Sequence, residues 1–153
     1  MPGARAYYDF LITQVIPYID AQYRTDPADR TLLGHSLGGL FTGLALLLEQ
    51  PDNRYFANYV SQDGSYWDQQ AVTVGLEEQL FSTISRLPVR LILVGASRPD
   101  GNDSEINSHV EWFHDLLASR HYADFDLVYR RYDIPHEGVI ALSLHDVLEL
   151  LYP

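Results

Sequence analysis

Short apolar runs alternate with longer segments of helical periodicity along most of the chain. The runs that suit strands cover residues 30–33, 56–61, 89–95 and 127–132, and the helical segments that follow them cover residues 37–48, 76–87, 106–120 and 141–151. This alternation is typical of parallel strands joined by right-handed helical crossovers. The run Val-Arg-Leu-Ile-Leu-Val-Gly at 89–95 is almost continuously apolar, as expected for a strand that is covered on both faces. The pattern predicts an α/β fold, a three-layer αβα sandwich around a mostly parallel sheet.

One further helix is predicted before the first strand. Apolar residues recur at helical spacing over residues 8–23, and Pro17 should kink or interrupt that helix. The chain of 153 residues is long enough for one domain and shows no internal repeat or interdomain linker. We therefore expect a single domain over residues 1–153.

The amino-acid composition limits the classes of binding partner and of site that are expected. Asp and Glu number 21 against 10 for Lys and Arg, which gives a formal net charge of −11. A surface this negative repels phosphate backbones and anionic lipids, so nucleic acid and membrane surfaces are not expected as partners. No apolar run approaches the roughly 20 residues that span a bilayer, and the first residues lack the apolar segment of a secretory signal. With no cysteine, disulfides, thiolate metal sites and a cysteine nucleophile are excluded.

The first strand leads directly into the sequence Gly34-His35-Ser36-Leu37-Gly38-Gly39, which opens an apolar helix. This fits the G-x-S-x-G nucleophile elbow, a tight strand-to-helix turn that exposes a serine hydroxyl. Ser36 is the predicted nucleophile, and the backbone N–H of Leu37 is the predicted oxyanion donor. Glycine is expected at 34 and 38 because a Cβ there would collide with neighbouring backbone. The alternative is a glycine-rich turn that serves only packing or phosphate binding.

A serine nucleophile needs a neighbouring base, which is usually histidine. Of the six histidines, His136 lies just after the last predicted strand, where the base of such a sheet belongs. A solvated loop histidine is the alternative for this residue. His35 lies within the elbow and should point away from Ser36, which favours a packing or substrate-lining role.

The acid of a triad lies between serine and histidine in this chain order. Asp103 and Asp100, which follow the strand at 89–95, are ranked close together, with Glu105 third. Asp103 could instead cap the helix that follows. Asp63 and Asp68, after the preceding strand, are further candidates, and a Ser–His pair without an acid partner is also open. The sequence has no H-E-x-x-H motif and no metal-ligand cluster, so neither a metal nor another cofactor is expected.

Four stretches of the chain resemble a known family. They are Phe10-Leu11 to Tyr23-Arg24 with Ile16-Pro17-Tyr18-Ile19-Asp20, the elbow with Leu40-Phe41, Ser61 to Asp68, and Pro135 to Val139. Together they resemble the esterase family of the α/β-hydrolase superfamily, and more narrowly the siderophore trilactone esterases of the enterochelin and bacillibactin type. Two stretches depart from the pattern. Residues 61–68 lack the proline of S-P-S-x-W-W and carry an extra residue, and Glu137-Gly138 replaces a small residue and serine in H-x-S-V.

The resemblance implies an α/β-hydrolase fold with Ser36 as nucleophile and His136 as base. It also implies that Trp67 lines the substrate cleft, although core packing is an equal alternative for this side chain. In the family, several strands precede the elbow strand, and one of their loops supplies the second oxyanion N–H. We therefore expect a partial domain, the C-terminal part of the family fold, in which the elbow strand is a sheet edge. Either the chain is a fragment of a longer hydrolase or a homodimer covers this edge.

The leading functional hypothesis is a serine hydrolase that cleaves a small-molecule carboxylic ester, with a siderophore lactone among the candidate substrates. An acyltransferase would use the same Ser36–His136 pair with an alcohol acceptor in place of water. The third hypothesis is a non-catalytic hydrolase fragment or binding module that keeps the elbow only for folding.

Overall fold

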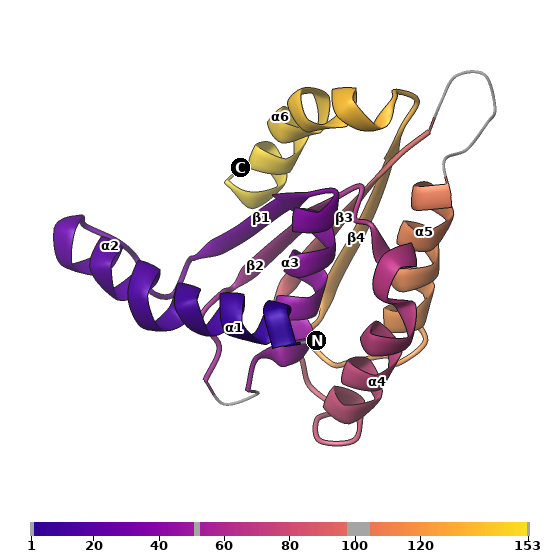
Figure 1. Cartoon of the computed structure of the whole chain (residues 1–153). Coiled ribbons are helices and arrows are strands. Elements are labelled where there is room, and N and C mark those ends of the chain that lie inside the picture. The colour runs from indigo at the N-terminus through magenta and orange to yellow at the C-terminus, as the bar shows by residue number, and fades with distance from the viewer. Residues whose placement is uncertain (1, 51–52, 98–104, 153) are drawn as a thin grey trace.

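The computed structural model describes residues 2–50, 53–97 and 105–152. Its four strands all run parallel and lie side by side in chain order, β1-β2-β3-β4 (Figure 1). The strands are β1 (Thr31–His35), β2 (Asn58–Gln62), β3 (Arg90–Ala96) and β4 (Asp126–Tyr132). The parallel sheet predicted from the alternation is confirmed. β1 is one edge of this sheet, as expected for the elbow strand.

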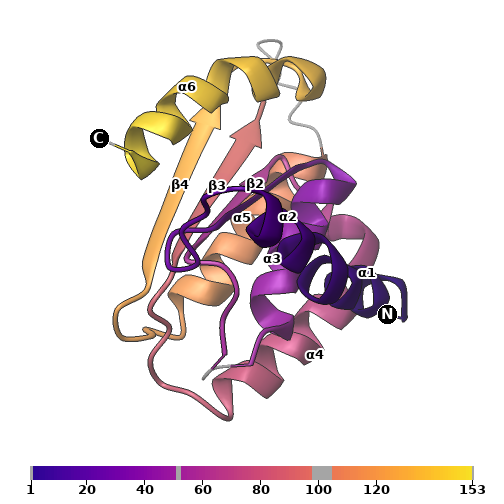
Figure 2. The ribbon, with the colours of Figure 1, turned by 90° about the vertical axis from the view of Figure 1, so that its left-hand side faces the viewer.

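Helices cover the sheet on both faces, which gives three layers. Helices of a first group lie on one face of the sheet, where two of them contact the strands and the third packs against its neighbouring helix, and a further helix contacts the opposite face (Figure 2). The first group comprises α3 (Leu37–Leu48), α4 (Gln70–Phe81) and α5 (Glu105–Ala118), and the opposite face carries α6 (Val139–Leu151). A short 3₁₀ turn, η3 (His136–Gly138), links β4 to α6. The predicted αβα sandwich is confirmed.

The core divides into two clusters, one on each face of the sheet. Leu91 and Leu93 belong to the large cluster under α3, α4 and α5, whereas Ile92 and Val94 belong to the small cluster under α6. Successive side chains of a strand point to opposite faces, so a strand buried on both faces needs apolar residues at every position. The continuous apolar run at 89–95 is explained by this double burial.

The N-terminal helix is longer than predicted and is interrupted as expected. It consists of α1 (Pro2–Phe10), a π-helical stretch η1 (Leu11–Val15) and α2 (Ile16–Gln22). Pro17 lies in the first turn of α2, where its missing N–H is tolerated. Most of the expected apolar face is not packed: Phe10 is 50% exposed and Tyr23 is 67% exposed. Figure 1 shows α2 projecting away from the sheet.

One helix begins and ends earlier in the chain than predicted. The segment expected to be helical at 76–87 is replaced by α4 (Gln70–Phe81), preceded by a 3₁₀ turn, η2 (Tyr66–Gln69). The apolar residue that extended the prediction, Leu87, is buried in the connection to β3, and its N–H donates to the carbonyl of Ala123 at 2.9 Å. The apolar spacing typical of a helix therefore continued past the end of α4, because the buried loop residue Leu87 stands where a longer helix would also have an apolar residue.

Within the described part of the chain, the helices are too short or too polar to cross a membrane.

Candidate active site

Ser36 occupies a strained turn between β1 and α3. Its backbone has φ 59° and ψ −120°, a conformation that non-glycine residues rarely adopt. The Ser36 N–H donates to the carbonyl of Gln62 at 3.0 Å, which ties the turn to the end of β2. A Cβ added at Gly34 would overlap the Gly38 carbonyl, so this tight turn requires glycine at 34. The local geometry is that of a nucleophile elbow.

The prediction that Gly38 is needed for close approach is wrong. A Cβ at Gly38 would meet nothing within 4 Å. The crowded position is Gly39, where an added Cβ would lie 2.9 Å from Gly64 Cα and 3.0 Å from the Gln62 carbonyl oxygen. Glycine at 39 therefore lets α3 approach the loop after β2, which carries other site residues.

The N-terminus of α3 begins directly after Ser36. Leu37 is the first helical residue, and N–H groups in the first turn have no acceptor within the helix. The first intrahelical bond runs from Leu40 N–H to the Ser36 carbonyl at 2.9 Å. The free N–H groups and the helix dipole favour negative charge at this point. The assignment of Leu37 N–H as oxyanion donor stays a prediction.

His136 is paired with a buried carboxylate from a neighbouring strand end. Its Nδ1–H donates to Asp63 Oδ2 at 2.6 Å. The Asp63 side chain is fully buried, and its other oxygen accepts the Ala96 N–H at 3.1 Å. Asp63 itself has φ 44°, and its own N–H donates to the Val94 carbonyl at 2.7 Å. The carboxylate is thus fixed by the ends of β2 and β3 and orients the His136 ring.

The structure does not test the two acid candidates ranked first. Asp100 and Asp103 fall outside the described residues, and Glu105 is the first residue of α5. Among the described residues, Asp63, a further candidate in the sequence, is the carboxylate that contacts His136. The usable signal was its place directly after a parallel strand, because site residues gather at carboxyl ends. The sequence does not show that Gln62 lies beside Val94, which sets where Asp63 meets its neighbours.

The Ser36 hydroxyl has a neighbour that the sequence analysis did not identify. Ser36 Oγ lies 3.4 Å from the Oγ of Ser65, a buried residue whose N–H donates to the Ser36 carbonyl at 3.1 Å. Among the hydrogen bonds between described residues, none joins Ser36 to His136. The ring of His35, the residue before Ser36, lies 4.3 Å from the His136 ring. The elbow and the histidine turn therefore meet at one end of the sheet.

The two residues predicted to line the substrate have different surroundings. His35 donates from Nε2 to the main-chain carbonyl of His136 at 3.0 Å. Trp67, on η2, is 51% exposed, so it is not an ordinary core residue. The buried aromatic of this turn is Tyr66, whose hydroxyl donates to Ser61 Oγ at 2.9 Å and whose pKa is raised by burial. Cleft lining by either His35 or Trp67 stays a prediction.

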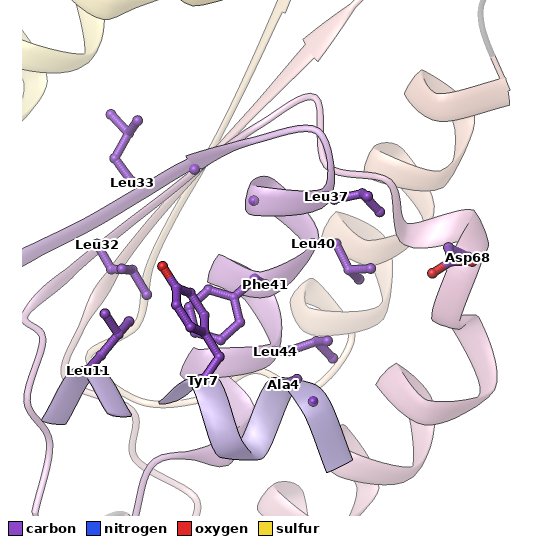
Figure 3. Close-up of a pocket in the computed structure, with 13 residues that line it drawn as sticks. Ala4, Tyr7, Leu11, Leu32, Leu33, Leu37, Leu40, Phe41, Leu44 and Asp68 are labelled. Carbon is purple, nitrogen blue, oxygen red and sulfur yellow. The ribbon is translucent and has the colours of Figure 1, made fainter. Parts of the chain in front are cut away.

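An apolar pocket of about 510 Å³ lies beside the uncovered edge of the sheet (Figure 3). Tyr7 from α1 and Phe41 from α3 meet there edge to face, with ring centroids 4.8 Å apart. Among the described lining residues are Leu37 and the single carboxylate Asp68, but neither Ser36 nor His136. The pocket is part of the apolar surface along β1, next to the elbow. Over residues 2–50, 53–97 and 105–152, no three His, Asp or Glu side chains gather as a metal site.

Two comparisons with known sequences relate this chain to esterases. The model of the Esterase family, described as "Putative esterase", matches residues 1–125, which include Ser36 and Asp63 but end before His136. The ferri-bacillibactin esterase BesA of Bacillus subtilis (strain 168) is 27% identical over 118 residues, which are 76% of this chain and 40% of the relative.

Two solved structures share the fold. The siderophore hydrolase EstA from Aspergillus nidulans matches with a TM-score of 0.81 and 23% identity, over 97% of this chain and 56% of that one. An IroE-like serine hydrolase from Shewanella oneidensis matches with a TM-score of 0.76 and 24% identity, over 94% of this chain and 46% of that one. The chain thus spans about half the length of these structures, and its sheet is part of an α/β-hydrolase fold. Because the family model covers most of its length, the chain belongs to the Esterase family.

Proposed function

We propose that the chain hydrolyses carboxylic esters, with Ser36 as nucleophile, His136 as general base and Asp63 as the carboxylate that orients the base. The observation that carries this proposal is the 2.6 Å hydrogen bond between His136 Nδ1 and the buried Asp63, beside a strained serine elbow. A packing role alone gives no reason to bury a carboxylate against this histidine, since burying a charge is costly without such a partner. Membership of an esterase family supports the same reaction class.

Each of the proposed site residues has a separate role in the first step of ester hydrolysis. With its Nδ1–H held by Asp63, the His136 ring presents Nε2 as the unprotonated nitrogen. The Ser36 hydroxyl turns from its 3.4 Å contact with Ser65 toward this nitrogen and gives up its proton as Oγ attacks the ester carbonyl. The Leu37 N–H stabilises the resulting oxyanion.

Three further proton transfers complete the reaction. The tetrahedral intermediate collapses, and His136 returns the proton to the departing alkoxide, which leaves as alcohol. Water then attacks the acyl-serine and gives a proton to His136. As this second tetrahedral intermediate collapses, His136 returns the proton to Ser36 Oγ, which releases the carboxylic acid and restores the Ser36 hydroxyl. In sum, ester and water give acid and alcohol.

For the substrate we propose a siderophore ester or lactone. Support comes from the relatives, since BesA is named a ferri-bacillibactin esterase and EstA a siderophore hydrolase. The chain covers 40% and 56% of those proteins, so both the activity and the substrate are proposals for this chain.

Labelling with a fluorophosphonate probe tests the proposed nucleophile. We expect the chain to gain the mass of one probe less hydrogen fluoride, because fluoride leaves as Ser36 Oγ bonds to phosphorus. We expect Ser36→Ala to abolish labelling and His136→Ala to slow it by at least about 10³-fold. Ser119→Ala is the matched control, because Ser119 is exposed on the surface away from the elbow. Labelling that persists in Ser36→Ala, or a folded chain that takes up no probe, would contradict the proposal.

A further inference from the structure

His35 and His136 contact each other in two ways although they lie 101 residues apart. The His35 Nε2 is 3.0 Å from the main-chain oxygen of His136, and the two ring centroids are 4.3 Å apart. A carbonyl oxygen can only accept a hydrogen bond, so the proton must be on Nε2 of His35. The contact therefore fixes the tautomer of His35 and uses its only N–H when the ring is neutral.

The hydrogen bond from His35 holds a segment that has few stabilising hydrogen bonds of its own. His136 begins η3, a 3₁₀ turn of three residues, and such turns are weakly held by their own hydrogen bonds. Asp63 holds the ring of His136 from the end of β2, and His35 holds its main chain from the end of β1. With ring and main chain both fixed, the direction of the remaining ring nitrogen is determined.

This arrangement differs from the substrate-lining role expected for His35. A lining residue presents its polar atom to the ligand, whereas the Nε2–H of His35 is already donated to the protein. The residue is also next to Ser36 in the chain, so the same strand end carries the nucleophile and the donor that holds its base.

We propose that His35 is a positioning residue that holds His136 in reach of Ser36 through its hydrogen bond to the His136 carbonyl. The proposal rests on the proposed function, since it takes His136 as the base. Orientation errors of about 1 Å can reduce a rate by roughly 10²-fold, and one net hydrogen bond corresponds to about tenfold. Loss of the His35 donor should therefore lower kcat without changing KM.

Two variants of the full chain separate the donor from the ring. His35→Gln keeps an N–H donor near the position of Nε2, and His35→Phe keeps a ring but removes the donor. We expect His35→Phe to lower kcat for an activated ester such as p-nitrophenyl acetate by roughly tenfold or more at unchanged KM, and His35→Gln to stay within about threefold of wild type. His145→Phe is the matched control, because the His145 side chain is 75% exposed on α6.

Three kinetic results would overturn the proposal. Equal losses in His35→Gln and His35→Phe would show that an N–H donor at this position does not account for the effect, and an increased KM at unchanged kcat would assign His35 to the substrate. Wild-type kinetics in His35→Phe would contradict it as well.

A proton NMR measurement keeps this test apart from failure of the proposed function. The Nδ1–H of His136 is bonded to a buried carboxylate, so it should give a slowly exchanging downfield resonance whether or not the chain is active. We expect His35→Gln and His145→Phe to keep this resonance and His35→Phe to broaden or lose it. A chain without esterase activity that shows this pattern keeps the positioning role, and a resonance unchanged in His35→Phe overturns it.

Discussion

β3 and β1 belong to the same parallel sheet but have very different surroundings. β3 has a strand on each side and helices over both faces, and its residues Leu91 to Val94 are fully buried. β1 pairs with β2 alone, its side chains are at least partly exposed, and Leu33 is 41% exposed. An apolar pocket lies along its open side. The proposed nucleophile is therefore attached to an edge strand whose residues are all at least partly exposed.

The difference shows how the two parts of the site are held. The Asp63–His136 pair is anchored to the buried ends of β2 and β3, so the core fixes its geometry. Ser36 depends on the local turn, where Gly34 lies against the Gly38 carbonyl and the Ser36 N–H bonds to Gln62. Glycine contacts in the elbow thus hold the proposed nucleophile in place, whereas core packing holds the Asp63–His136 pair.

The largest expected effect separates the two glycines of the elbow. Gly34→Ala places a Cβ on the Gly38 carbonyl, which should destabilise the fold by at least about 3 kcal/mol and displace Ser36. Gly38→Ala meets open space in a helix and should change the free energy of unfolding by no more than about 1 kcal/mol. Urea unfolding of both variants measures this pair, and similar losses in the two would contradict the local account of the elbow.

A pair of apolar truncations compares the two strands directly. Ile92→Ala removes a fully buried side chain from β3 and should lower the free energy of unfolding by about 2–5 kcal/mol. Leu33→Ala on β1 should lower it by less than about 1 kcal/mol, because the side chain is already partly in water. Urea midpoints with unchanged slopes are the readout. An equal loss of stability in Leu33→Ala would show that the Leu33 side chain is buried in solution and that β1 is therefore covered.

The smallest expected effect concerns the buried carboxylate that fixes α1 near the uncovered edge. Glu49 accepts hydrogen bonds from Tyr8 at 3.0 Å and Tyr59 at 2.6 Å, and burial raises the pKa of its carboxyl above 4.5. The folded state then holds the proton more tightly than the unfolded state. Its contribution to stability is present below pH 4.5 and is lost as pH rises through the raised pKa.

Comparison with Glu49→Gln isolates this contribution, because glutamine does not titrate. From pH 4.5 upward, the free energy of unfolding of wild type should fall relative to that of Glu49→Gln, as measured by urea unfolding at several pH values. A wild type that gains stability relative to the variant over this range would show that hydrogen bonds to the carboxylate outweigh its burial.

Much of this fold could be predicted from the sequence, because a strand that is buried on both faces of the sheet has an almost continuously apolar sequence. The run at 89–95 and the elbow at 34–39 each specify a local structure, and both were located correctly. The C-terminal end of α4 was missed because the buried loop residue Leu87 continued the helical phase. Gly38 and Gly39 could not be told apart, since which one is crowded depends on the loop at Gly64.

Site residues that directly follow a strand end could be predicted from the sequence. Contacts that depend on which residues of neighbouring strands lie side by side were harder to predict. Ser36 and His136 were both chosen from their position along the chain, and the structure brings their segments together. The contact of Asp63 with His136 depends on register between β2 and β3 and on the path of the turn after β4. Hydrophobic patterns indicate neither the register between these strands nor the path of this turn.

The identity of the orienting carboxylate tests the central claim most directly. The measurement is the second-order rate of fluorophosphonate labelling of Asp63→Asn against the double variant Asp100→Asn/Asp103→Asn. We predict that Asp63→Asn slows labelling by about 10²–10⁴-fold, because the asparagine would hold His136 in the wrong tautomer, and that the double variant stays within about twofold of wild type. A slow double variant beside an unimpaired Asp63→Asn would contradict the account.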